Sequence, residues 1–320
     1  MIAYFGAKGG KKFRDFINVK IPKTGIKTYV EPFSGSMGTY LEDNEGTFDN
    51  IENIVYNDMN KHQVNLMYCC KYSEKMLEAI ESLKKSVLKI DENASVVEKW
   101  EFYKGIYNKF KSNTFLDDNN FELGDFKRAS MYAFLITSAF SGVHPRGGGF
   151  SGFNKKKEEL KLEILIRKLK TNKYTDKLNK ITNFHNIDFE ELIKKYDSED
   201  TYLYLDPPYA RMDPKTGLDD ARRLFWYGSD DEGVFGVQSH RRLLELIKNS
   251  KCRWSLSYYY FPLLDELLPK DKYLWFEKEV FRSSAQGGNN HESKKDSEKV
   301  SAKGTELLIL NYNPETGELL

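Results

Sequence analysis

The chain has 320 residues, of which 40% are hydrophobic and 30% charged, so it can bury a substantial core and is not an intrinsically disordered protein. Forty-nine Lys and Arg balance forty-eight Asp and Glu to a net charge of +1, which excludes a polycation that binds nucleic acid by bulk charge alone. No apolar run approaches the roughly 20 residues of a membrane span, and no basic, apolar leader opens the sequence. We therefore expect a cytoplasmic protein with no membrane partner.

The first half of the chain combines a strand-rich start with a long helical region. Short apolar runs at Thr28 to Val30 and Ile54 to Tyr56 flank a helical stretch at Ser36 to Leu41, a pattern typical of a βαβ unit. Helical periodicity then runs from Lys61 to Lys111 and again from Phe126 to Phe140.

A loop and a basic segment follow the helices. Ser141 to Phe150 contains three consecutive glycines and a proline, which predicts an exposed irregular loop. Residues 151–180 then carry ten Lys or Arg against four acids. This local excess favours contact with nucleic acid, and a solvated helix face is the alternative.

The second half alternates strands and helices, which predicts an α/β fold with a mostly parallel sheet covered on both faces. The expected strands are Ile181 to Phe184, Thr201 to Leu205, Arg253 to Ser257, Tyr273 to Val280 and Glu306 to Tyr312, and the clearest helices are Ser239 to Asn249 and Phe261 to Leu268. The last two strands have only a polar connection, Ser283 to Gly304, between them, so we expect an antiparallel edge hairpin.

Metal and disulfide sites are not indicated. The cysteines, Cys69, Cys70 and Cys252, form no Cys-x-x-Cys pair, and the five histidines lie far apart without a metal-ligand spacing. We therefore expect buried thiols and no metal ion.

The tetrapeptide Asp206-Pro207-Pro208-Tyr209 directly follows the buried-strand pattern that ends at Leu205, at a position where ligands bind in open α/β sheets. The two prolines remove two N–H donors and fix two φ angles, which leaves a rigid array of carbonyl groups. Together with a carboxylate and an aromatic ring, this array complements a planar ring that bears an amino group, such as adenine or cytosine. An ordinary turn at a strand end is the alternative.

The chemistry of such an amine follows from its lone pair, which is delocalised into the ring and is a poor nucleophile. The Asp206 carboxylate and the Pro207 carbonyl can accept both amino hydrogens while Tyr209 stacks on the base. A base inside a duplex cannot reach such a turn, so the nucleotide must rotate out of the stack.

A second candidate site surrounds the first predicted strand. The segment from Val30 to Gly38 contains glycines that let the backbone approach a ligand closely, and Asp58 ends the second strand 20 residues after Gly38. An acid at that place can accept both hydroxyls of a ribose. Because the turn lacks a full Gly-x-Gly-x-x-Gly, an NAD-binding protein and a purely structural turn remain alternatives.

The order of these motifs resembles that of the Dam-type DNA adenine methyltransferases of bacteria and phages. The matching segments are Tyr4-Phe5-Gly6-Ala7-Lys8, the EPFxGxG turn at Glu31 to Met37, Asp58, the helical insert, Asp188-Phe189, Asp206 to Tyr209, and the closing strand Gly304 to Tyr312. The chain departs from the family at Met37, which occupies the place of the second glycine of the turn.

The resemblance implies a Rossmann-like methyltransferase fold that uses S-adenosyl-L-methionine, with residues 1–60 and 171–320 as the catalytic domain and residues 61–170 as a helical target-recognition domain. It implies site-specific methylation of the adenine amino group in double-stranded DNA, by base flipping and direct displacement. Methylation of the cytosine amino group or of adenine in RNA, a non-catalytic DNA-binding module and, more distantly, an NAD oxidoreductase remain alternatives.

The resemblance also implies roles for individual residues. The cofactor contacts would be Tyr4, Gly6, Lys8, Glu31, Phe33, Gly35, Ser36, Asp58, Asp188, Phe189 and Asp206, with Lys8 pairing with a carboxylate of the cofactor. The catalytic turn would be Asp206, Pro207, Pro208 and Tyr209, and the DNA contacts Arg146, Phe150, Lys155, Lys156 and Lys157. A monomer suffices for one flipped base, and a cognate restriction endonuclease is a candidate partner.

Two aromatic clusters lie near the expected base pocket. For Tyr258 to Phe261, core packing is favoured over a place in the pocket. Phe225-Trp226-Tyr227 follows the catalytic turn and is a candidate for closing over the base.

Overall fold

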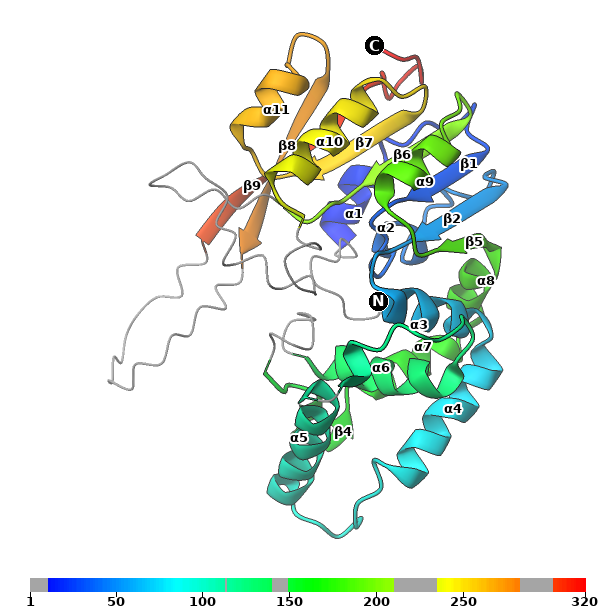
Figure 1. The fold of residues 1–320 in the computed structure, drawn as a ribbon, viewed down its shortest axis with the longest axis vertical. Coiled ribbons are helices and arrows are strands. Elements are labelled where there is room, and N and C mark those ends of the chain that lie inside the picture. Colours follow the sequence, from blue (N-terminus) through cyan, green and yellow to red (C-terminus); the bar gives the residue numbers. More distant parts are fainter. Residues whose placement is uncertain (1–10, 113, 140–148, 210–234, 283–301) are drawn as a thin grey trace.

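The computed structural model describes residues 11–112, 114–139, 149–209, 235–282 and 302–320 (Figure 1). A seven-stranded sheet forms its centre, in the order β5-β2-β1-β6-β7-β9-β8. The strands are β1 (Thr28–Glu31), β2 (Asn53–Asn57), β5 (Ile181–His185), β6 (Thr201–Leu205), β7 (Arg253–Tyr258), β8 (Leu274–Arg282) and β9 (Ala302–Leu310).

The pairing confirms the predicted mostly parallel sheet with an antiparallel hairpin at one edge. Strands β5, β2, β1, β6 and β7 are parallel, and β9 is antiparallel to both β7 and β8. The hairpin is longer than the sequence predicted, because β8 continues to Arg282 and its pairing with β9 begins at Ala302. The glycine at 304, expected in the connection, therefore lies within a strand.

Helices cover both faces of this sheet, and further helices form a lobe below it. The helices of the described residues are α1 (Lys11–Asn18), α2 (Gly38–Leu41), α3 (Lys61–Lys71), α4 (Ser73–Ser86), α5 (Val96–Ser112), α6 (Phe126–Ser138), α7 (Leu162–Leu169), α8 (Asn172–Lys180), α9 (Phe189–Lys195), α10 (Val237–Lys248) and α11 (Pro262–Leu267), with a short 3-10 turn at Thr114–Leu116. The two faces bury separate apolar clusters, one against α9, α10 and α11 and the other against α1, α2, α3 and α8.

Alternation along β6 shows how the sequence specifies these faces. Tyr202 and Tyr204 enter one cluster, and Leu203 and Leu205 enter the other, as the period of two in a strand requires. The hydroxyl of Tyr202 donates to Ser255 at 2.7 Å, so a tyrosine can be fully buried without an unsatisfied polar atom.

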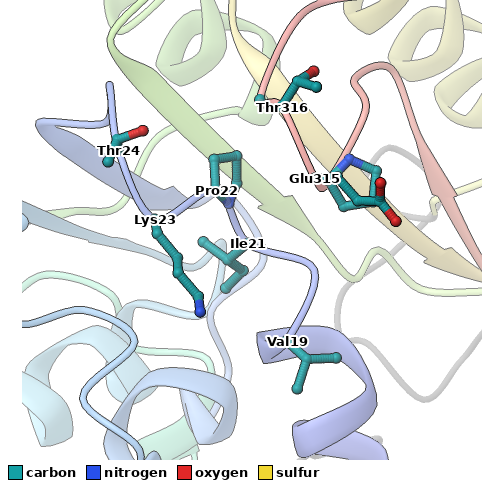
Figure 2. Close-up of a pocket in the computed structure, with 9 residues that line it drawn as sticks. Val19, Ile21, Pro22, Lys23, Thr24, Glu315 and Thr316 are labelled. Carbon is teal, nitrogen blue, oxygen red and sulfur yellow. The ribbon is translucent and has the colours of Figure 1, made fainter.

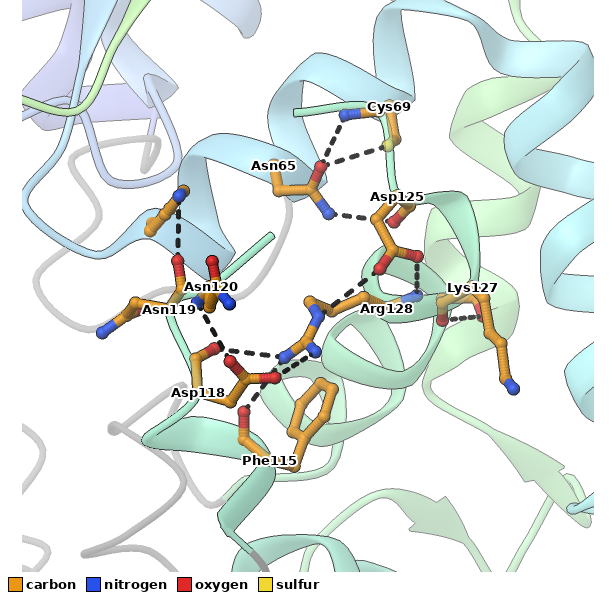
Figure 3. Close-up of polar contacts among 12 residues, drawn as sticks. Asn65, Cys69, Phe115, Asp118, Asn119, Asn120, Asp125, Lys127 and Arg128 are labelled. Carbon is orange, nitrogen blue, oxygen red and sulfur yellow. Dashed lines mark hydrogen bonds and ion pairs between the residues drawn. The ribbon is translucent and has the colours of Figure 1, made fainter. Parts of the chain in front are cut away.

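The chain between β2 and β5 forms a helical lobe below the sheet (Figure 1). Arg128 on α6 organises part of it, through an ion pair with Asp118 at 2.6 Å and a hydrogen bond to the Phe115 carbonyl at 3.3 Å (Figure 3). Asn65 on α3 donates to the carbonyl of Asp125 at 2.9 Å, which ties α3 to the start of α6.

The basic segment contains a short hairpin that the sequence analysis did not predict. Strands β3 (Phe153–Asn154) and β4 (Glu159–Leu160) form a small antiparallel hairpin before α7 begins. The Asn154 side chain accepts hydrogen bonds from the backbone N–H groups of Lys156 and Lys157, so this asparagine supplies the turn.

The three cysteines are buried, as predicted. Within the described ranges, none of the helices has both the length and the apolar character needed to cross a membrane.

The turn between β1 and α2 contains an unusual backbone conformation. Met37 precedes α2 with φ 49° and ψ 42°, in the left-handed region that a residue with a Cβ rarely adopts. This is the position where the resembled family has glycine, and the departure noted in the sequence therefore falls on a residue whose backbone favours glycine. The Met37 side chain is completely buried, and its packing offsets the backbone strain.

We expect Met37→Gly to be more stable than Met37→Ala by about 1 kcal/mol. Both variants lose the same buried side chain, but only alanine keeps a Cβ at positive φ. Urea unfolding of the two variants measures the difference, and alanine as the more stable variant would contradict the left-handed assignment.

Candidate active site

The ends of three neighbouring strands form the candidate site. Strand β1 lies between β2 and β6, and all three are parallel, so their carboxyl ends meet at one edge of the sheet. The turn of residues 32–37 follows β1, Asp58 follows β2 and Asp206 follows β6. This juxtaposition brings together the two motifs that the sequence singled out separately.

Gly35 is the fixed point of the turn after β1. Its N–H donates to the Asp58 carboxylate at 2.9 Å, and its carbonyl accepts from Tyr56 at 2.6 Å and from Gln63 at 2.7 Å. The other Asp58 oxygen accepts the N–H of Asn60 at 2.8 Å. The carboxylate therefore holds the turn in place.

Two buried polar atoms at this turn have no hydrogen-bond partner within the described chain. They are the hydroxyl oxygen of Ser36 and the side-chain oxygen of Gln63. Burying such atoms without a partner is unfavourable, so a bound polar group at the turn would relieve a real cost. The residues present therefore fit a ligand that carries hydroxyl or amino groups.

Asn57, which the sequence reasoning missed, connects three segments of the site. Its side chain donates to the carbonyls of Pro32 at 2.8 Å and Ile187 at 3.1 Å, and accepts the N–H of Ile187. It thereby joins the end of β1, the end of β2 and the segment before α9. No local pattern distinguishes this asparagine from an ordinary strand-end residue.

Glu31 lies deeper than a cofactor contact was expected to lie. It is 3% exposed, and one carboxyl oxygen accepts hydrogen bonds from the hydroxyls of Tyr29 and Thr39, both at 2.6 Å. Burial raises the pKa of Glu31 to about 8, and the charge of Asp206 also raises it. Glu31 is therefore protonated near neutral pH and contributes no negative charge to this region.

Asp188 and Phe189 have different roles: Asp188 caps a helix, and Phe189 packs against an aromatic ring. Asp188 is the N-cap of α9, accepts the N–H of Glu190 at 2.8 Å and forms an ion pair with Arg242 at 2.8 Å. The Phe189 ring lies 5.5 Å from Phe33, so these two predicted cofactor contacts do lie together.

The candidate catalytic turn, Asp206 to Tyr209, is held by residues from β9, from β7 and from the segment directly after β7. The Tyr209 hydroxyl donates to Glu306 at 2.5 Å, and the Tyr209 ring lies 5.1 Å from Tyr258 and 4.7 Å from Tyr259. Burial raises the pKa of Tyr209 well above its ordinary value, and the charges of Asp206 and Glu306 add to the effect. The phenol therefore remains a neutral hydrogen-bond donor.

Tyr258 supports the same turn from inside the core. It is 1% exposed, and its hydroxyl contacts the Pro208 carbonyl at 3.4 Å and hydrogen-bonds with His240. Burial lowers the pKa of His240 to about 4, so this histidine is neutral. The prediction of core packing is confirmed for Tyr258 and Phe261, whereas Tyr260 is exposed.

The predicted DNA contacts separate into surface and interior residues. Lys155, Lys156 and Lys157 are exposed at the tip of the β3–β4 hairpin, whereas Phe150 packs against Trp100 and Tyr107.

Several other Lys and Arg side chains of residues 151–180 form ion pairs with Asp or Glu. The pairs are Arg167–Glu159, Lys168–Glu42, Lys177–Asp43 and Lys180–Asp49. Three adjacent exposed lysines thus lie at the hairpin tip, and Lys170 and Lys173 are exposed beyond α7.

Some predicted residues lie outside the described residues. These are the cofactor contacts Tyr4, Gly6 and Lys8, the DNA contact Arg146, and the aromatic segment Phe225-Trp226-Tyr227.

A cavity of about 300 Å³ lies away from this site (Figure 2). It is lined by Val19, Ile21 to Thr24 and Pro314 to Gly317, where the segment before β1 meets the segment after β9. This is the amino end of the parallel strands, opposite to the edge that carries Asp206.

A family model described as D12 class N6 adenine-specific DNA methyltransferase matches residues 4–259. Comparison with curated proteins gives no significant match.

The raised pKa of Glu31 predicts a pH-dependent stability. The folded state holds this proton more tightly than the unfolded state does. The free energy of unfolding therefore falls as pH rises from about 5 to 8. Glu31→Gln keeps an oxygen that can accept both hydroxyls and has no proton to lose. We expect its stability relative to the native chain to grow by about 1 kcal/mol per pH unit over this range.

Urea unfolding between pH 5 and 8.5 measures this trend. Glu122→Gln, at an exposed position, is the matched control and should show no such trend. A stability difference between Glu31→Gln and the native chain that stays constant with pH would contradict a protonated Glu31.

Proposed function

The chain belongs to the D12 class N6 adenine-specific DNA methyltransferases, and we propose that Asp206 to Tyr209 is the turn that holds the target adenine. The protein is thus an enzyme that methylates adenine in DNA. DNA is its substrate, and the adenine amino group is the acceptor. The family match favours this activity over cytosine, RNA, NAD and purely DNA-binding alternatives.

One observation carries the assignment of the turn. Asp206 ends β6 beside the Gly35 turn of β1, close enough for its charge to raise the pKa of Glu31 on that neighbouring strand. An amine held at Asp206 would therefore lie beside the segment proposed to hold the methyl donor. Bringing the two reactants together in this way lowers the entropic part of the barrier.

The turn would prepare the amine by hydrogen bonding. The Asp206 carboxylate and the Pro207 carbonyl would accept hydrogen bonds from its two N–H groups, which favours a lone pair localised on nitrogen. The buried Pro207 and the partly buried Pro208 keep the backbone rigid, and the Tyr209 ring stacks on the base. Direct displacement then needs no covalent intermediate with the protein.

We propose S-adenosyl-L-methionine as the methyl donor, which when bound supplies an electrophilic methyl group on a sulfonium. Asp58 would accept from the ribose hydroxyls, and Ser36 would gain the partner that it lacks in the described chain. Phe33 and Phe189 offer an aromatic wall. Tyr4, Gly6 and Lys8 are proposed contacts on the resemblance alone.

Residues 61–170 are the proposed target-recognition domain, and residues 1–60 and 171–320 the catalytic domain. The exposed lysines at 155, 156 and 157 would contact phosphates and hold the duplex while the target base rotates out. Arg146 is proposed to contact DNA, and Phe150 to support the hairpin from inside the lobe.

The remaining proposals concern partners. One pocket suffices for one flipped base, so we propose a monomer. A site-specific methyl mark would protect DNA from an endonuclease of the same specificity, the class of partner proposed here. Because its substrate is DNA, we propose that the enzyme works in the cytoplasm.

Asp206→Ala should lower methyl transfer at least about 100-fold, because it removes the charged acceptor while the fold persists. Asp200→Ala changes the same residue type at the opposite end of the same strand and should leave the rate unchanged. The measurement is incorporation of tritium from labelled cofactor into unmethylated duplex DNA, with calorimetry to check cofactor binding. A native rate in Asp206→Ala would contradict the assignment of the turn.

Replacing Lys155, Lys156 and Lys157 together by Gln should weaken DNA binding and reduce the slope of log Kd against log salt by about 2 to 3. Replacing Lys170 and Lys173, which are also exposed, by Gln is the matched control. Fluorescence anisotropy across a salt series measures both. Equal losses in the two variants would show that bulk charge, and not the hairpin, binds the backbone.

A further inference from the structure

A buried carboxyl group on β9 contacts the catalytic turn from outside it. Glu306 is 4% exposed and accepts the hydrogen bond of the Tyr209 hydroxyl at 2.5 Å, from a position 97 residues further along the chain. Strand β9 pairs with β7 from Leu310 back to Leu307, and Glu306, the next residue, lies opposite Lys278 in the ladder with β8. The acceptor is therefore mounted on a strand that is paired with β8 at its own position and with β7 directly beside it.

The contacts of Tyr209 leave its ring little freedom. Tyr258 and Tyr259 pack against the ring at centroid distances of 5.1 and 4.7 Å, with interplanar angles of 37° and 77°. These neighbours define where the ring lies, and the hydrogen bond at the far end of the ring limits its tilt. An aromatic ring needs two torsions fixed, and packing together with one terminal hydrogen bond fixes both.

A buried hydrogen bond is costly to break, because the partner left behind has lost contact with water as well. The raised pKa of Tyr209 keeps its hydroxyl proton in place through the physiological range. The anchor is thus present whenever the enzyme works.

We propose that Glu306 is a positioning residue, which holds the Tyr209 ring in the orientation that stacks on the flipped adenine. The inference rests on the proposed role of Tyr209 as the stacking platform. Productive geometry tolerates errors of only about 10 to 20° in such a group, so a ring released from its anchor would align the amine poorly. Glu306 acts through Tyr209 and touches neither reacting atom.

The test uses the full chain, the labelled cofactor and duplex DNA that contains the recognised sequence, first identified by sequencing of DNA modified by the enzyme. The variants are Glu306→Ala, Glu306→Gln, Tyr209→Phe and the double variant Tyr209→Phe with Glu306→Ala. Glu277→Ala, at an exposed position on β8, is the matched control with native kinetics expected.

Glu306→Ala and Tyr209→Phe should each lower kcat about tenfold, with KM for DNA and the affinity for cofactor unchanged. The double variant should be no worse than either single one, because both remove the same hydrogen bond. Glu306→Gln should recover most of the loss, since its carbonyl oxygen still accepts. Independent losses that multiply in the double variant, or a native kcat in Glu306→Ala, would overturn the proposal.

A spectroscopic readout separates positioning from mere support of the fold. With 2-aminopurine in place of the target adenine, stacking on Tyr209 quenches the fluorescence of the flipped base. Glu306→Ala should make the flipped base brighter than in the native complex, and unchanged brightness counts against the proposal. If Glu306→Ala does not fold, the kcat values of Tyr209→Phe and Glu306→Gln are compared instead. Equal kcat values in these two variants would contradict the proposal that Glu306 anchors the Tyr209 ring.

Failure of the inference can be distinguished from failure of the proposed function. A native rate in Tyr209→Ala would remove Tyr209 as the platform, and the role of Glu306 would fall with it. A large loss in Tyr209→Ala together with native kinetics in Glu306→Ala would remove only the positioning role.

Discussion

The hydrogen bond from the Gly35 N–H to the Asp58 carboxylate is the constraint on which the site depends. It joins the segment after β1 to the end of β2, and Tyr56 and Gln63 fix the same glycine through its carbonyl. Strand β1 pairs with β6, so the fixed turn after β1 lies next to Asp206, which follows β6. The proposed cofactor and base sites would thus be two parts of one edge of the sheet.

The fold was predictable where local pattern and tertiary environment agree. Every predicted strand of the central sheet exists, because alternation as in Tyr202 to Leu205 places each side chain on a definite buried face. The β3–β4 hairpin was missed because its strands have two residues each, too few to show a period, and a run of lysines obscures the turn at Asn154. The left-handed Met37 was equally hidden, since methionine carries no local signal for positive φ.

The site was predictable to the extent that chemistry follows from neighbouring residues. Asp206 to Tyr209 and Asp58 stand out by residue type and by their places after strands. Glu306 and Asn57 do not, because their partners lie 97 and 25 or more residues away and only the sheet brings them together. Phe150, predicted to contact DNA, has a half-buried ring that packs against Trp100 and Tyr107, which no local pattern indicated.

The connections of the helical lobe also bear on how such enzymes can diversify. Helices α3 and α8 lead out of β2 and back into β5, and both pack on the catalytic sheet, while Asn60 at the start of α3 donates to Asp58. The boundary at which a lobe could be exchanged between relatives therefore lies beyond these helices, after Lys71 and before Asn172. Grafts cut at the strand ends themselves would carry away helices that pack on the central sheet, whereas grafts cut further out would leave those helices in place.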